Sequence, residues 1–594
     1  MTARLQLQGL KCVRVDGLPG MFTRRRLIFA GMFIIILGIV SLAMVGSHVG
    51  RAAPSTITVP DDYPTIQQAI NAASPGDTIF VRNGTYHENV LVNKTVNLIG
   101  ENNQTTIIDA GGVGTVIRVS ASGLTPGSAD NVTIANFTLA NSGTGVTDSS
   151  LTVDGVEGCN VTGVRDVNDP TYGLWLNNSW GSTLDGNYVP NSTYGIVLTY
   201  SISNRIRNNT LANNSYGILL ASSSNNVLCS NSIVGAIVYA LYLTVSNYNN
   251  VSRNQILNNY YGAYLDSSSY NNFRKNTFQY NNFAAAWLSS SQYNCFVKNC
   301  VTINSQYGFY LEYSSYNTIS GNFLKGNSNI AAYVDYSNYN LFQRDEFYNN
   351  SIAIQTYNSS NNNVIGSNFT SNYKNALSLT VSYNNNFYYN IFKDNLQDVN
   401  LNNSINNWDS GSIWGGGNYW ADSSNIDQNL TGIGEFPHTL DANNTDHYPL
   451  MGLYYSRNFS GGMLDVITNS WVWGLHYSPT NGTVDMTVSN MTAGQTAAFA
   501  RFTFPYSLMN PTNLTVFLNG GMTPLSYANY TLHDNGTYRW IYIAFPLSAP
   551  NQTIDIVPAF PPITPEFPSF LAFTIMAASL LAIVAYKRRR VRAA

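Results

Sequence analysis

The sequence predicts an all-β fold: a right-handed parallel β-helix, then a small β-sandwich and a C-terminal transmembrane helix. The first observation is a repeat of about 22–23 residues that runs from Tyr172 to Gln397, a period typical of solenoids. The second is that inward apolar positions alternate with outward ones in each repeat, which indicates strands. The third is an Asn at one turn position of nearly every repeat. Because stacked Asn side chains can hydrogen-bond from coil to coil, the combination indicates a parallel β-helix.

The N-terminal segment predicts export. Three arginines at residues 24–26 precede an apolar run over 27–45, and small residues follow. This order is typical of a secretory signal peptide, which we assign to residues 1–53. Residues 1–20, which precede a more natural start at Met21, are a possible gene-model extension. The apolar run is long enough to span a bilayer, so an uncleaved anchor is the alternative.

The C-terminal segment predicts a membrane anchor with a basic tail over residues 565–594. An apolar stretch over 569–586 has about the length that crosses a bilayer, and the cations at 587–590 place the tail inside. Together with Pro-Glu-Phe-Pro at 565–568, this order resembles the PEF-type C-terminal sorting signals of archaeal surface proteins. The resemblance implies that a peptidase removes the helix and a lipid replaces it; a permanent single-pass anchor is the alternative. We expect an extracellular ectodomain at the cell surface, anchored in the plasma membrane by this single helix.

Charge is unevenly distributed along the chain. The formal net charge is −3, but twelve of the 29 basic residues and one of the 32 acidic residues lie in the two ends. Residues 53–586 therefore hold 17 cations against 31 carboxylates and carry −14. This acidic middle argues against a nucleic-acid partner. Roughly two dozen Asn-x-Ser/Thr sequons in this part predict a glycoprotein.

Each repeat supplies about three short strands separated by polar turns. Positions three and five of the first strand are apolar, as in Leu174 and Leu176, and two further apolar positions follow, as in Phe273 and Phe278. The recurring Asn is expected to form a structural ladder, with Asp345 as the single substitution. The predicted ladder residues are Asn187, Asn209, Asn231, Asn254, Asn276, Asn299, Asn322, Asn368 and Asn390.

The start of the repeat region carries four motifs, 58–70 (TVPDDYPTIQQAI), 76–79 (GDTI), 84–86 (GTY) and 88–90 (ENV). With these motifs the sequence resembles a known family, the pectin-lyase-like right-handed β-helices, notably the NosD-like group. The resemblance implies a β-helix over about 55–450. A short amphipathic helix at 64–73 is expected to cap the first coil and to protect its edge.

Residues 417–450 are predicted to close the β-helix. The motifs at 417–422 (GNYWAD), 432–435 (GIGE) and 446–450 (DHYPL) resemble the closing segment of archaeal NosD-like surface proteins. In that group the middle commonly carries an acidic, calcium-loop-like run, whereas this chain has Gln-Asn-Leu-Thr at 428–431. This difference from the group weakens the argument for a calcium site in this segment. We assign no metal ligand, and Ca²⁺ binding stays a possible property of the chain. The carboxylates concerned are Asp422, Asp427 and Asp441.

Residues 455–558 do not follow the 22–23-residue repeat. Alternating stretches such as 483–488 and 540–544 are separated by Asn-Gly turns, which predicts a small antiparallel β-sandwich. We expect this domain to act as a stalk between the β-helix and the membrane.

One outward face of the β-helix is aromatic. The residue between the two inward positions of the first strand is Tyr or Trp in consecutive coils, and coils stack at ~4.8 Å, so the rings form a continuous strip. Such a strip suits stacking against sugar rings, and ordinary surface packing is the alternative. The predicted glycan-binding residues are Tyr242, Tyr264, Trp287, Tyr310 and Tyr333. A second series in a turn, interpreted as structural, comprises Tyr248, Tyr270, Tyr293, Tyr316 and Tyr339.

Two positions beyond the strip, the same face carries carboxylates. Glu312 and Asp335 fall on neighbouring coils, and Asp266 lies two coils from Glu312. Close carboxylates can share a proton, bind Ca²⁺ or act as acid and base in glycoside cleavage. These three residues are the candidate catalytic residues of a polysaccharide lyase or a glycoside hydrolase.

The NosD resemblance also implies copper delivery, which the residues contradict. Copper sites need clustered His, Cys or Met, and none of the six His lies in the regular coils. We therefore expect a structural or glycan-binding role in the envelope, with polysaccharides or cell-envelope glycans as partners. A carbohydrate-active enzyme is the alternative.

Overall fold

The computed structural model describes residues 53–121, 127–509, 514–521, 525, 530–547 and 551–558. The chain divides into two compact units. The first comprises Met1–Asn425 and Phe436–Leu450, and the second comprises Ile426–Glu435 and Met451–Ala594. The predicted signal peptide, apart from its last residue, and the predicted anchor lie outside the described residues. Within the described ranges, no helix has the length and hydrophobicity needed to cross a membrane.

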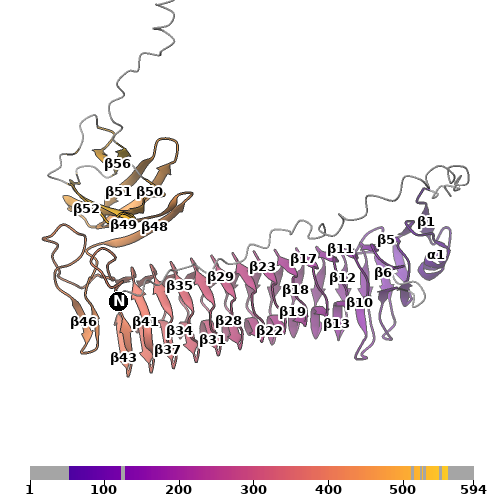
Figure 1. Ribbon diagram of the computed structural model, residues 1–594. Helices are drawn as coiled ribbons and strands as arrows, with labels where there is room; N and C mark the ends of the chain where they lie inside the picture. The colour runs from indigo at the N-terminus through magenta and orange to yellow at the C-terminus, as the bar shows by residue number, and fades with distance from the viewer. Residues whose placement is uncertain are drawn as a thin grey trace, which may run out of the picture. The chain divides into compact units, whose positions relative to one another are not determined.

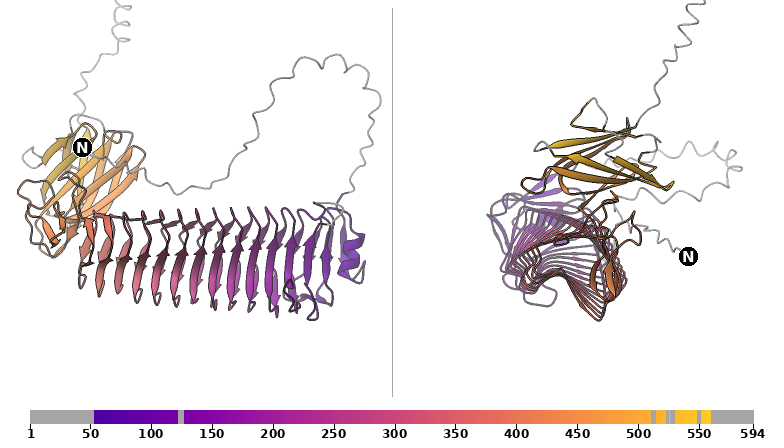
Figure 2. Two further views of the ribbon diagram at one scale, coloured as in Figure 1. Left: turned by 60° about the horizontal axis from the view of Figure 1, so that its bottom comes forward. Right: turned by 90° about the vertical axis from the view of Figure 1, so that its left-hand side faces the viewer.

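The first unit is a parallel β-solenoid of the right-handed type, which confirms the predicted β-helix (Figure 1). Each regular coil contributes one strand to each of three parallel sheets, and Figure 2 shows the coils stacked side-on and end-on. We name the sheets A, B and C. Sheet A has 16 strands, from β1 (Thr56–Val59) to β44 (Ile405–Asn407), sheet B has 15, from β3 (Gly84–Tyr86) to β45 (Tyr419–Trp420), and sheet C has 14, from β4 (Val90–Val92) to β43 (Val399–Asn402).

The strands of sheet C have two consecutive buried positions, two and three, which strict alternation does not predict. Position two is Gly or Ala in the regular coils, and a Cβ on Gly262 would lie 2.3 Å from the carbonyl oxygen of Ala285 in the next coil. Where position one is Tyr, it lies at the outer surface like positions four and six, whereas Ala284, Ile330 and Ile352 at position one are buried. The strands that form the site are β19 (Tyr216–Ala221), β22 (Tyr239–Thr244), β25 (Tyr261–Asp266), β28 (Ala284–Ser289), β31 (Tyr307–Glu312), β34 (Ile330–Asp335) and β37 (Ile352–Tyr357).

A short helix covers the first coil. α1 (Ile66–Ala72) is shorter than the expected range 64–73 because Thr65 is its N-cap. Glu88 accepts hydrogen bonds from the first two helical N–H groups at 2.9 and 3.0 Å, and Lys94 donates to two carbonyl groups at the other end at 3.1 and 3.0 Å. Each charge opposes the helix dipole. The helix is thereby held against β1, β2 (Thr78–Val81) and β4.

The predicted Asn ladder lies in the turn from sheet A to sheet B. Each Asn side chain donates to the amide oxygen of the next coil at 2.9–3.1 Å. Asp345 accepts in the same series, but Ser367 occupies the next position, so the assignment of Asn368 is wrong. In each regular coil one residue with left-handed (positive φ) backbone forms the corner between sheets A and B, and the next residue is the ladder residue. In this coil the corner residue is Gly366, at φ 63°. Asn368 instead begins β39 (Asn368–Thr370) at the surface.

The solenoid contains further side-chain ladders that the sequence analysis does not predict. The turn from sheet C to sheet A holds a buried Ser and a buried Asn, such as Ser268 and Asn271, and the turn from sheet B to sheet C holds a buried Asn, such as Asn281. Each side chain bonds to its equivalents in neighbouring coils. These residues share the period of the repeat, which is the signal that identifies them.

The closing segment is held by a buried carboxylate. Asp446 accepts hydrogen bonds from Trp420 Nε1 at 2.9 Å and from the Asn418 N–H at 2.8 Å. A Cβ on Gly417 would lie 1.8 Å from Asp446 Oδ1, so only glycine fits. Burial raises the pKa of Asp446 to about 7. These motif residues therefore serve to stabilise the end of the solenoid.

The second unit contains two antiparallel sheets. Their strand orders are β48-β49-β52-β55-β54 and β50-β51-β56-β53, and both contribute to one cluster of buried apolar side chains that includes Val466, Phe502 and Ile554. The sandwich and its role as a stalk stay predictions. The strands are β48 (Leu453–Phe459), β49 (Gly462–Thr468), β50 (Ser470–Ser478), β51 (Thr483–Asn490), β52 (Ala497–Pro505), β53 (Leu514–Leu518), β54 (Tyr530–Asp534), β55 (Tyr538–Pro546) and β56 (Gln552–Pro558).

Candidate functional site

The aromatic strip of sheet C is continuous over five coils. Its members occupy paired positions of neighbouring strands, and successive ring centroids lie 5.1–5.3 Å apart. The strip ends where Leu219 and Gln355 take the same position. Its members are the five residues that the sequence predicts, Tyr242, Tyr264, Trp287, Tyr310 and Tyr333, all half-buried.

A second aromatic column lies beside the strip. The tyrosines at position one of the strands turn outward, and their rings contact the strip, with centroid distances of 4.9 Å for Tyr239–Tyr264 and 5.0 Å for Tyr307–Tyr310. Strict alternation would place position one inward, so the sequence prediction misses this column. The Tyr-Gly pair is nevertheless its signal, because a small second residue can be buried together with position three and leaves the preceding Tyr at the surface. The column comprises Tyr172, Tyr194, Tyr216, Tyr239, Tyr261 and Tyr307.

Two buried polar atoms on this face, one on the middle coil of the strip and one on its last coil, have no hydrogen-bond partner in the described part of the chain. They are Trp287 Nε1, which is a donor, and Asp335 Oδ1, which is an acceptor. The two residues lie two coils, ~10 Å, apart along the solenoid. Buried polar groups are normally paired.

The predicted carboxylates form one column beside the strip. Asp266 pairs with Ser289, which pairs with Glu312, which pairs with Asp335. Glu312 and Asp335 are therefore neighbours, whereas Ser289 separates Asp266 from them. Ser289 Oγ donates to Glu312 Oε2 at 3.4 Å, and the Tyr310 hydroxyl donates to Asp335 Oδ2 at 3.4 Å.

Burial shifts the pKa values of Asp335 and of the neighbouring Tyr310. It raises the pKa of Asp335, and nearby Glu312 raises it further, although the Tyr310 hydrogen bond acts in the opposite direction. Burial also raises the pKa of Tyr310, with contributions from both carboxylates. Tyr310 therefore keeps its proton at neutral pH. The face presents a protonated phenol and a partly buried carboxyl group side by side.

No three His, Cys, Asp or Glu side chains within the described residues lie close enough to hold a metal ion. Two carboxylates of the closing segment accept hydrogen bonds from nearby backbone, Asp427 from the Gly432 N–H at 2.8 Å and Asp441 from the Asn443 N–H at 2.8 Å. Ca²⁺ binding stays a prediction.

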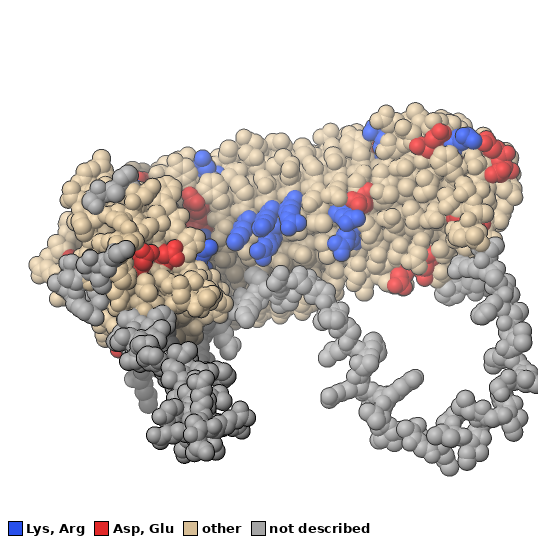
Figure 3. Space-filling model, turned by 90° about the horizontal axis from the view of Figure 1, so that it is seen from above, with Lys and Arg blue, Asp and Glu red and all other residues tan. Residues whose placement is uncertain are grey.

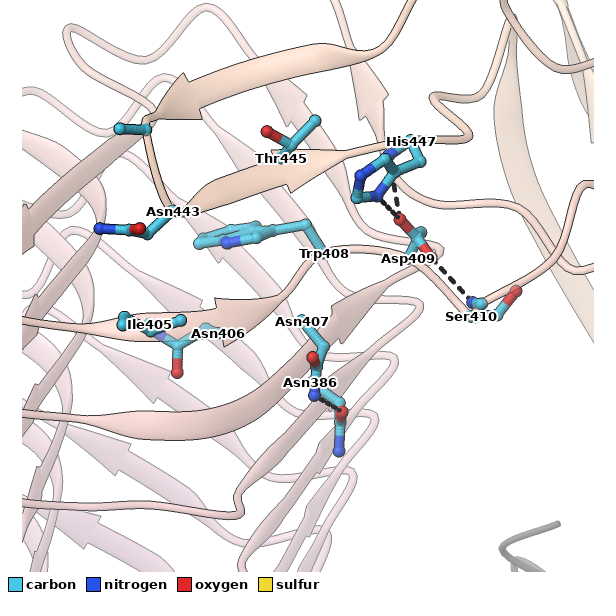
Figure 4. Close-up of a pocket in the computed structure, with 12 residues that line it drawn as sticks. Asn386, Ile405, Asn406, Asn407, Trp408, Asp409, Ser410, Asn443, Thr445 and His447 are labelled. Carbon is cyan, nitrogen blue, oxygen red and sulfur yellow. Dashed lines mark hydrogen bonds and ion pairs between the residues drawn. The ribbon is translucent and has the colours of Figure 1, made fainter. Parts of the chain in front are cut away.

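A separate cavity of ≈ 580 Å³ lies where the solenoid closes (Figure 4). His447 Nδ1 contacts Asp409 Oδ2 at 3.0 Å, and Asn407 donates to Asn386 at 2.9 Å. Trp408 lines the cavity but directs its own N–H to Asn444 Oδ1 at 3.0 Å. None of the predicted catalytic or glycan-binding residues lies here, so the cavity is distinct from the sheet C face.

Comparison with family models finds one match. The model described as periplasmic copper-binding protein (NosD) matches residues 141–306 and 290–425, together just under half of the chain. The match covers most regular coils and agrees with the resemblance found in the sequence. No curated protein matches the chain significantly.

Solved structures with similar folds share little sequence with this chain. The A-module of mannuronan C-5 epimerase AlgE6 from Azotobacter vinelandii is 14% identical, covering 57% of this chain and 94% of its own, with a TM-score of 0.30. DFA-IIIase from Arthrobacter chlorophenolicus A6 is 12% identical, covering 52% and 94%, with a TM-score of 0.38. At these scores the likenesses bear on neither activity nor substrate.

The donor chemistry of this chain does not fit the copper binding named in the family description. Residues 141–425, which the family model matches, contain no His and no Met. Cysteine thiolates remain as soft ligands, but burial raises the pKa of Cys159 to about 12, which keeps it protonated. This region therefore lacks the clustered soft ligands that a copper site needs.

Proposed function

We propose that the protein is a glycan-binding component of the cell envelope and that the aromatic strip of sheet C is its binding face. The continuous strip, with an unpartnered donor on its middle coil and an unpartnered acceptor beside its last coil, carries the proposal. Flat aromatic rings stack against the apolar faces of sugars, and the two polar atoms suit hydroxyl groups. The carboxylate column beside the strip would repel carboxylated or sulfated polymers, so the preferred ligand is a neutral or aminated glycan.

A double substitution of Trp287→Ala and Tyr310→Ala tests the face. We expect affinity for the neutral oligosaccharide that binds best among cellohexaose, mannohexaose and chitohexaose to fall roughly 5- to 150-fold, since each stacked ring is worth about 0.5–1.5 kcal/mol. Isothermal titration calorimetry measures the change, and thermal unfolding confirms that the variant folds.

The matched control removes two exposed rings outside the face, by Tyr200→Asn and Tyr280→Asn. Both positions have positive φ, which Asn tolerates. The control should bind like the parent protein. An equal loss in both variants, or binding by neither the parent nor the variants, would refute the glycan-binding face and leave a purely structural role.

The second candidate function is a carbohydrate-active enzyme. Adjacent Glu312 and Asp335, with the pKa of Asp335 raised, favour it because one carboxyl group must hold a proton in glycoside cleavage. Asp266 would act two coils from Glu312. Substituting Glu312→Gln, which leaves the polar atoms proposed for glycan binding in place, separates the two functions. A binding protein keeps its affinity for the oligosaccharide, whereas an enzyme loses turnover.

The proposed location is the cell surface. The signal-like segment, the sequons and the basic tail after the apolar stretch at 569–586 support it. In this proposal the second unit is a β-sandwich stalk that links the solenoid to a membrane anchor. Protease treatment of intact cells should release the solenoid into the medium, and its protection from protease would contradict the location.

A further inference from the structure

A second face of the solenoid, on sheet A, has an aromatic border and a cationic border. Its central strands are β23 (Asn250–Ser252), β26 (Asn272–Arg274) and β29 (Cys295–Val297). A turn precedes each strand and a corner follows it, and the three-residue strand between them spans ~10 Å. Both borders run parallel to the solenoid axis, one on each side of these strands. An extended polymer that lies along the axis over the strands would therefore contact both borders.

The aromatic border is a stack of exposed tyrosines in the preceding turns. Neighbouring ring centroids lie 4.9–5.1 Å apart, and the ring planes lie within 11° of parallel. The spacing indicates offset stacking, which leaves part of each ring face uncovered. The exposed fractions range from 37% to 48%. The tyrosines are Tyr248, Tyr270, Tyr293, Tyr316 and Tyr339.

The cationic border follows the same strands. Arg253, Lys275 and Lys298 occupy the corner after β23, β26 and β29, and Arg274 ends β26. Successive coils are ~4.8 Å apart, so four cations lie within about 10 Å along the axis. Figure 3 shows a cluster of Lys and Arg on the middle of this surface. None of the four forms an ion pair within the described part of the chain.

Folding does not require cations at this corner. The three corner cations have φ of 55–56°, a left-handed conformation that favours Gly or Asn. Other coils place Gly186, Gly321 or Asn208 at the same corner. Three adjacent like charges also repel one another. Their arrangement is therefore unfavourable for the free protein and becomes favourable when an anion is bound.

We propose that this sheet A face binds a linear acidic polysaccharide, with its carboxylate or sulfate groups on the cations and its sugar rings against the tyrosines. The charge spacing favours this polymer over a nucleic acid. The border offers about one cation per coil, or one per ~4.8 Å along the axis, whereas double-stranded DNA carries one negative charge per ~1.7 Å. The remaining surface is acidic and would repel a densely charged polyanion.

This site is independent of the sheet C face and selects the opposite charge class. The two faces lie on different sheets, and the sheet C face carries carboxylates where the sheet A face carries cations. One molecule could therefore hold a neutral and an acidic glycan at once. Loss of one binding activity need not affect the other, so the two proposals can fail separately.

The test compares the parent chain with a triple variant, Arg253→Asn, Lys275→Asn and Lys298→Asn, in which Asn suits the corner conformation. The probes are polygalacturonate fragments, heparin fragments, poly(U) and phosphatidylglycerol vesicles. We expect binding to one of the acidic glycans that weakens with salt, and at least a tenfold loss of affinity in the triple variant. A second variant, Tyr270→Asn with Tyr293→Asn, should lower affinity severalfold and keep the salt dependence.

The matched control neutralises three cations elsewhere, by Arg165→Gln, Lys325→Gln and Lys374→Gln. It changes the net charge equally and should lower affinity less than threefold. The proposal is overturned if neither acidic glycan binds, if the control loses as much affinity as the triple variant, or if poly(U) or vesicles bind more tightly than both glycans. Polygalacturonate against heparin distinguishes carboxylate from sulfate recognition.

Discussion

Substituting Asp345→Asn should stabilise the solenoid at pH 8 by about 4 kcal/mol. Asp345 is fully buried in the Asn ladder, and burial raises its pKa from 3.8 to about 7. In the unfolded chain the carboxyl group ionises near pH 4, so unfolding releases a proton between pH 4 and 7, and stability falls as pH rises through this window. Three pKa units correspond to about 4 kcal/mol. Asn is the residue that most other coils place here.

Urea or thermal unfolding of the parent and the variant at pH 4 and pH 8 measures this difference. The parent and the variant should differ by less than about 1 kcal/mol at pH 4, where the folded carboxyl group is neutral and the unfolded one is about half ionised, and the difference should grow up to pH 7. Asp394→Asn, which removes an exposed carboxylate, is the matched control and should show no such divergence. A difference that does not depend on pH would refute the buried carboxyl group as its cause.

Substituting Asn276→Ala should destabilise the solenoid by about 3 kcal/mol. The side chain accepts from Asn254 N and Nδ2 at 2.9 and 3.0 Å, and donates to Val251 O at 2.9 Å and to Asn299 Oδ1 at 3.1 Å. Alanine leaves at least three buried polar groups without this partner, each worth about 1 kcal/mol. Because coils are stabilised mainly by their neighbours, the loss should appear as local opening.

Hydrogen exchange and limited proteolysis locate that opening, and unfolding experiments give its size. Opening is expected around residues 251–299, the coils that Asn276 joins. Asn272→Ala, on the outward face of the same coil, is the control and should change stability by less than about 0.5 kcal/mol. Equal effects of the two substitutions would show that the ladder bonds contribute little.

The repeat predicts the solenoid because each coil must bury the same positions. Once the period is known, register follows, and register alone brings Trp287 beside Tyr310 and Glu312 beside Asp335. The strip and the carboxylate column were therefore predictable from the sequence. Their binding or catalytic roles do not follow from register.

Other features depend on backbone geometry that a period cannot supply. The tyrosines at position one lie outward because the small residue at position two is buried together with position three. Asn368 lies outside the ladder because Gly366 sets the corner one residue earlier than the Asn pattern suggests. The cationic border also depends on these corners, since Lys275 and Lys298 lie in register only when each left-handed residue is located.

A crystal structure of the protein grown with its preferred neutral oligosaccharide tests the central claim most directly. We expect sugar rings stacked along Trp287 and Tyr310, with ligand hydroxyl groups bound to Trp287 Nε1 and Asp335 Oδ1. A saturating oligosaccharide found elsewhere on the molecule, with the sheet C face bare, would contradict the glycan-binding role of that face.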